Sequence, residues 1–91
     1  MSVVFDISVC PTDMEIGDDV LDADLALQRI RDVATEEWGE NVEFRTLQVG
    51  YRQGDAWAKS WNNGTRDDSL AEVLMEDLID WTDEDLYLQA D

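Results

Sequence analysis

The chain has 91 residues, the length of a single domain, with 23 acidic residues against six basic ones and a net charge of −17. Apolar residues make up 44% of it and four residues are tryptophan, which excludes a disordered acidic tail because such tails lack large apolar side chains. The charge repels phosphates, so we expect no direct binding to nucleic acid and none to a membrane surface.

The first predicted elements are a strand and a helix. Every second residue along positions 2–9 is a large apolar one, from Val3 to Val9, and the residues between them are of varied polarity. This alternation predicts a strand that Pro11 ends. Residues 12–19 are polar and predict a loop. Apolar side chains then recur three or four positions apart along residues 20–38, which predicts a helix that Gly39 ends as a C-terminal cap.

Two further strands are predicted after this helix. Residues 41–52 form the first of them, although the face that carries the apolar side chains changes midway, so we expect a bulge near Arg45 or Thr46. The Gln-Gly dipeptide that follows predicts a tight hairpin turn, after which residues 55–61 return as the second strand. The Asn-Asn-Gly sequence at 62–64 predicts another turn.

Residues 69–81 predict the second helix, which begins with a capping box formed by Ser69 and Glu72. Residues 86–88 are either a short last strand or a fraying helical end. The predicted fold class is α+β, in the order β-α-β-β-α-β, with an antiparallel sheet and both helices on one face, as in the ferredoxin-like arrangement or a similar one. The last strand is uncertain, and residues 1–91 are predicted to form one acidic globular domain.

Few kinds of catalytic site are compatible with the sequence. It has no histidine and one cysteine, Cys10, so it has no thiolate–imidazole pair, no ordinary zinc site and no internal disulfide. Its glycines are too scattered for a phosphate-binding loop, and its acidic clusters lack the spacing of a calcium-binding EF-hand. We therefore expect no catalytic residue, cofactor or metal. The N-terminus lacks a signal-peptide pattern, which predicts a cytoplasmic protein.

One acidic pattern is specific. Four acidic residues lie four positions apart and predict a row along the second helix, with about 6 Å between neighbours: Asp68, Glu72, Glu76 and Asp80. Like charges at this spacing oppose helix formation, so the row has a cost that a function would explain. Acidic neighbours extend the row, and the predicted partner-binding residues are Asp68, Glu72, Glu76, Asp77, Asp80, Asp83, Glu84 and Asp85.

The strand over residues 55–61 carries Trp57, Lys59 and Trp61 on one face. Aromatic residues on a sheet face can stack nucleobases, but the net charge argues against RNA. We expect at least one of the two tryptophans to pack under the helices or to cover an edge of the sheet. An exposed tryptophan would be a candidate anchor at a protein interface.

No motif identifies a family. In size and charge, the chain resembles the small acidic proteins of phages and mobile elements that mimic DNA and block restriction, CRISPR or repair proteins. It also resembles the acidic immunity proteins and nuclease inhibitors that neutralise a toxic nuclease. Both resemblances imply a basic nucleic-acid-binding protein as partner, and neither carries over a residue.

The main hypothesis is a charge-mimic inhibitor of such a partner, with an immunity protein as the alternative. A third alternative is a halophilic interaction domain without an inhibitory role, because aspartate exceeds glutamate and arginine exceeds lysine. Concentrated salt screens self-repulsion and would account for the charge without a partner. The sequence is also compatible with a homodimer.

Overall fold

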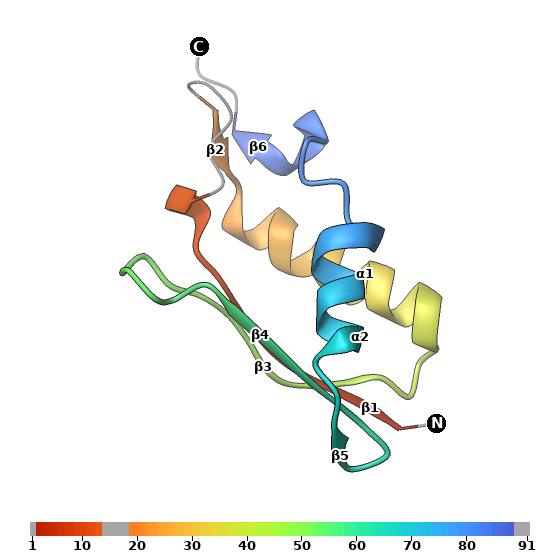
Figure 1. Ribbon diagram of the computed structural model, residues 1–91. Helices are drawn as coiled ribbons and strands as arrows, with labels where there is room; N and C mark the ends of the chain where they lie inside the picture. The colour runs from red at the N-terminus through yellow and green to blue at the C-terminus, as the bar shows by residue number, and fades with distance from the viewer. Residues whose placement is uncertain (1, 14–18, 89–91) are drawn as a thin grey trace.

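The computed structural model describes residues 2–13 and 19–88 (Figure 1). Four strands form the main sheet in the order β3-β1-β4-β5. Strand β1 (Val3–Val9) lies between β3 (Glu43–Val49), which runs parallel to it, and β4 (Trp57–Asn62), which runs antiparallel. The short β5 (Thr65–Arg66) pairs with the end of β4. The protein is therefore a small α+β domain with a mixed sheet.

The prediction of an antiparallel sheet is wrong for the β1–β3 pair, and the hairpin predicted at Gln53 and Gly54 does not form. A turn does occur there, because the amide of Asp55 donates to the carbonyl of Arg52 at 3.1 Å. However, β1 separates the two strands that this turn connects. Strands on either side of a third lie about 9–10 Å apart, too far for a two-residue hairpin loop. The ferredoxin-like strand order is accordingly not found.

The predicted bulge in β3 is confirmed. Phe44 pairs with Phe5 and Thr46 pairs with Asp6, so Arg45 is the extra residue. Because two residues of β3 lie opposite one residue of β1 at the bulge, the apolar side chains after it point to the same face as the buried side chains of β1.

Helix α1 (Ala23–Trp38) begins three residues later than predicted. The side chain of Asp22 accepts from the amides of Asp24 and Leu25 at 3.0 and 3.3 Å, which satisfies two of the free N–H groups at the helix start. Gly39 ends the helix as predicted, with a φ of +88° and its amide bonded to the carbonyl of Thr35 at 2.8 Å.

The segment before α1 is a strand instead of a helical turn. Strand β2 (Val20–Leu21) pairs with β6 (Tyr87–Leu88) in a separate two-stranded sheet. The last strand therefore exists but does not join the main sheet. A 3₁₀ turn, η1 (Pro11–Asp13), follows β1, and most of the loop predicted at 12–19 lies outside the described residues.

The second helix is shorter and less regular than predicted. Helix α2 (Ser69–Glu72) is α-helical, and it continues as a π-helical segment, η2 (Val73–Leu78). The capping box is absent, because Asp68 is the residue that precedes the helix and the Ser69 hydroxyl bonds to Asp67. A last 3₁₀ turn, η3 (Glu84–Leu86), precedes β6.

Both α1 and α2 cover the same face of the sheet, as predicted (Figure 1). The core lies between this face and the helices. It is formed by one face of β1, by Ala26, Ile30 and Ala34 of α1, and by Leu74 of η2, all at most 2% exposed. None of the helices in the described ranges is long and apolar enough to cross a membrane.

Candidate partner-binding surface

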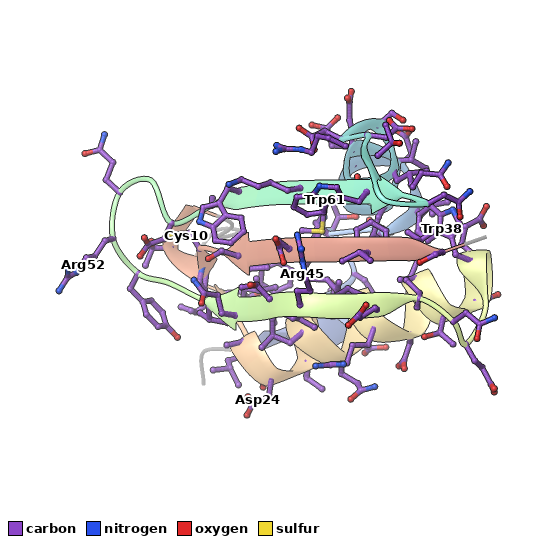
Figure 2. The ribbon with its side chains drawn as sticks, turned by 90° about the horizontal axis from the view of Figure 1, so that it is seen from below. Cys10, Asp24, Trp38, Arg45, Arg52 and Trp61 are labelled. Atoms are coloured by element: carbon purple, nitrogen blue, oxygen red, sulfur yellow. The ribbon has the colours of Figure 1, made fainter. Side chains whose placement is uncertain are left out.

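The acidic side chains of α2 and η2 point away from the core. Ala71 and Leu74 are buried, whereas Glu72, Glu76 and Asp77 are exposed. In the described part of the chain, none of these three carboxylates has a hydrogen-bond or ion-pair partner. Figure 2 shows the side chains of this helix grouped at one edge of the sheet, many of them ending in oxygen.

The prediction of a straight row at four-residue spacing is wrong. The row needs α-helical geometry from Asp68 to Asp80, but the helix changes to wider i→i+5 turns at Val73. It ends at Leu78, because Ile79 has an extended backbone with φ −97° and ψ 124°. The side chains that were expected in line are therefore spread over a surface.

Two contacts fix the end of the helix. The indole N–H of Trp81 donates to the carbonyl of Met75 at 2.6 Å, which satisfies one of the carbonyl groups that a helix end leaves free. The hydroxyl of Tyr87 donates to the carbonyl of Trp81 at 2.6 Å, and burial together with the nearby Asp80 raises the pKa of Tyr87. These contacts hold the acidic turn after the helix against the rest of the fold.

Asp68 belongs to the scaffold. Its carboxylate binds the guanidinium of Arg66 in a bidentate pair, with 2.8 Å between Nη2 of Arg66 and Oδ2 of Asp68. It also accepts from the amide of Ser60 in β4 at 3.3 Å. The hydrogen bond from Arg66 is the main reason that the pKa of Asp68 lies below its ordinary value. Asp68 therefore ties the start of α2 to the sheet.

Two of the acids beyond the helix also have structural contacts. Asp80 accepts from the amide and hydroxyl of Thr82, and these hydrogen bonds lower the pKa of Asp80. Asp83 accepts from the amide of Asp85 at 3.0 Å and pairs with Arg29 of α1 at 3.1 Å. Both carboxylates shape the turns that lead into η3.

Five of the eight predicted residues thus remain as exposed carboxylates without a partner among the described residues. We call them the acidic surface, and they are Glu72, Glu76, Asp77, Glu84 and Asp85. The first three come from α2 and η2, and the last two come from η3. In Figure 1 the chain runs on from α2 towards β6, and Asp85 lines a small pocket together with Leu25 and Arg29 of α1.

None of the ion pairs among the described residues involves this surface. In the described structure, Arg29, Arg45 and Arg66 form ion pairs with aspartates outside the acidic surface. Lys59 holds its ammonium 5.3 Å from the ring centroid of Trp57, and Arg31 lies over the ring of Phe44 at 5.4 Å.

Figure 2 shows Trp61 on the face of the sheet opposite the helices, and Trp57 shares this face because it lies four residues before Trp61 in β4. Trp57, Lys59 and Trp61 pair with Ser8, Asp6 and Val4, the β1 residues that point away from the core. Neither tryptophan therefore packs under the helices, which leaves the second expected place, an edge of the sheet, and both side chains are half-buried. The strand alternation had correctly placed both on the same face.

Two guanidinium groups contact Trp61 on this open face. Arg45 lies 4.1 Å from the ring centroid and Arg66 lies 5.2 Å from it. Arg45 also pairs with Asp6 at 3.0 Å. The bulge in β3 brings Arg45 to this position, so the parity change in the sequence was the available signal for the contact.

A pocket of about 380 Å³ borders the acidic surface. It lies where the C-terminal end of β1, the outer edge of β4 and η2 meet, and it is lined by Cys10, Trp57, Ala58, Met75, Glu76 and Trp81, among others. Sequence reasoning missed it, because three segments far apart in the chain form its walls.

Residues 2–13 and 19–88 hold no group of three or more acidic or thiol side chains placed to bind a metal ion. Comparisons of the chain with protein-family models, with curated proteins and with solved structures find no match.

Proposed function

We propose that the chain is a small acidic inhibitor of a basic nucleic-acid-binding protein, and that its carboxylates occupy sites where this partner holds phosphates. The observation that carries the proposal is the acidic surface itself. It presents five exposed carboxylates on a packed framework, and no described cation pairs with them.

The arrangement suits recognition by charge. Proteins that bind nucleic acid contact phosphates with clustered lysine and arginine side chains, which a carboxylate surface can engage in the same way. Charge complementarity steers association and raises its rate, more so at low salt. Because helix and turn contacts hold the backbone of the surface, little backbone entropy is lost on binding. The proposed mode of action is non-catalytic and cytoplasmic.

The test compares two variants that change the net charge equally. Glu72→Lys with Asp77→Lys reverses two charges on the acidic surface and leaves Glu76 at the pocket intact. Glu36→Lys with Glu37→Lys reverses two exposed charges at the end of α1 and serves as the matched control.

Each protein is immobilised to capture partners from a host lysate, and the affinity of a captured basic protein is then measured by biolayer interferometry. We expect the first variant to lose about tenfold or more in affinity and the control to lose much less. Equal affinities for the two variants would refute the acidic surface as the binding site. The captured protein's identity separates an anti-restriction or anti-CRISPR inhibitor from an immunity protein for a toxic nuclease.

A further inference from the structure

The pocket beside η2 has one wall made by an unpaired strand edge. Strand β5 pairs with Trp61 and Asn62, and no strand of residues 2–13 and 19–88 pairs with the outer side of the preceding part of β4. Ser60 directs both its backbone groups outward, because its amide donates to Asp68 and its carbonyl accepts from the amide of Asp67 at 2.9 Å.

Backbone groups two residues apart in a strand point the same way. The amide and carbonyl of Ala58, one of the residues that line the pocket, therefore also point outward from the sheet edge. No described residue bonds to them across this edge. The strand edge at the pocket thus offers a carbonyl acceptor that has no partner among the described residues.

The other walls are aromatic and acidic. Trp57 and Trp81 both line the pocket, and the indole N–H of Trp81 is already bonded to Met75, so the ring is held in place. Glu76, an exposed carboxylate of the acidic surface, lines the same pocket. No lysine or arginine lines it. Trp57 attracts a cation within the chain already, since Lys59 lies over its ring from the open face.

We propose that this pocket binds one arginine side chain of the basic partner, an inference that rests on the proposed function. The guanidinium stacks on an indole, pairs with the carboxylate of Glu76 and donates to the carbonyl of Ala58. Tryptophan is the best aromatic acceptor for a cation, and the contact strengthens when water is excluded.

Arginine fits these groups better than lysine or an apolar side chain does. Its planar fork of N–H donors matches a carboxylate, stacks on aromatic rings and is more weakly hydrated than an ammonium group. An apolar side chain would leave the carbonyl of Ala58 and the carboxylate of Glu76 without a partner as they lose water. The pocket's volume is near the lower end of the roughly 300–1,000 Å³ of ligand sites, which suits one side chain.

The test uses N-acetyl-arginine amide as the probe, with N-acetyl-citrulline amide as its uncharged isostere. Binding is followed by NMR through the indole N–H signals of the tryptophans. We expect the Trp57 and Trp81 signals to shift saturably with arginine at millimolar concentration, while the signal of Trp38 in α1 stays constant. Citrulline should bind about tenfold more weakly, because it lacks the charge.

Two variants check the pocket. Glu76→Gln should weaken arginine binding about five- to tenfold, whereas Glu72→Gln, on the same helix but outside the pocket, should leave it unchanged. Trp57→Leu keeps an apolar side chain at this half-buried position and should also weaken binding, with the Trp81 signal reporting that the fold persists. Equal binding of arginine and citrulline, or full binding by Glu76→Gln, would overturn the proposal.

The two proposals fail separately. The arginine titration needs no partner protein, and the charge-reversal test leaves every residue of the pocket unchanged. If arginine fails to bind while reversal at Glu72 and Asp77 still abolishes partner binding, the pocket assignment alone is wrong. If arginine binds and charge reversal has no effect on the affinity for the partner, the assignment of the acidic surface as the binding site is wrong.

Discussion

Replacing Ser60 by alanine tests how the sheet holds the acidic helix. The side chain of Ser60 is fully buried, and its hydroxyl donates to the carbonyl of Asp67 and accepts from the amide of Ala71 at 3.0 Å. Ala71 is near the start of α2, where helix amides lack partners within the helix. Ser60 therefore serves as a cap from the neighbouring strand.

The magnitude follows from the groups left without partners. Ser60→Ala removes two hydrogen bonds and leaves one buried donor and one acceptor unsatisfied, each at a cost of about 1–3 kcal/mol. Relaxation and water entry recover part of this, so we expect a loss of about 2–4 kcal/mol. For a domain of this size, that corresponds to a fall in Tm of roughly 10–25 °C.

The assay is urea unfolding followed by circular dichroism, with Ser69→Ala as the control. Ser69 is exposed and its hydroxyl contacts only the side chain of Asp67, so its loss should cost about 0.5 kcal/mol or less. A change below about 0.5 kcal/mol for Ser60→Ala as well would refute the role of Ser60 as the link between β4 and α2.

The remaining predictions concern pH, backbone and salt. The folded-state pKa of Asp68 is lowered, so the stability that it adds is complete above its ordinary pKa of 3.8 and is lost as the pH falls through the folded value. The stability difference between the wild type and Asp68→Asn, measured by urea unfolding, should therefore be largest near neutral pH and vanish in acid; a constant difference would contradict this origin. Gly64→Ala should cost about 1–2 kcal/mol in thermal unfolding, because Gly64 has a φ of +84° in the β4–β5 turn, and an unchanged Tm would argue against that conformation. The protein should melt cooperatively at low salt, with a Tm that rises as salt screens its self-repulsion, whereas an unfolded chain at low salt would support the halophilic alternative.

Short sequence patterns predicted the features that depend on a few neighbouring residues, such as a bulge, a helix end and a turn. The parity change in β3 indicated the bulge at Arg45, and Gly39 indicated the end of α1. The Asn-Gly turn was also correct, since Asn63 and Gly64 both have positive φ, as a two-residue turn between paired strands requires.

Strand neighbours could not be predicted in this way. Alternation shows which face a side chain occupies, but it does not show which strand lies beside it. The Gln-Gly turn was compatible with direct pairing of β3 and β4, and only packing over the whole sheet places β1 between them. The pairing of Val20 and Leu21 with Leu88 and Tyr87 is likewise a contact between the two ends of the chain.

The candidate site was predicted in part. Spacing correctly indicated an acidic helix, and five of the predicted carboxylates are exposed and have no partner among the described residues. The regular row depended on an α-helix that continues to Trp81, whereas burial of Ile79 and the Trp81–Met75 hydrogen bond end the helix earlier. The structural roles of Asp68 and Asp83 depend on Arg66 and Arg29, and no local spacing reveals the second of these pairs.

The most direct test of the central claim is competition with DNA. The affinity of the captured partner for a labelled duplex is measured by fluorescence anisotropy while the concentration of this protein is raised. The proposed charge mimicry predicts full displacement of the DNA, with an apparent DNA affinity that falls as the protein is added, and displacement by Glu72→Lys with Asp77→Lys that needs a concentration about tenfold or more higher. A ternary complex in which the partner holds both the DNA and this protein would contradict it.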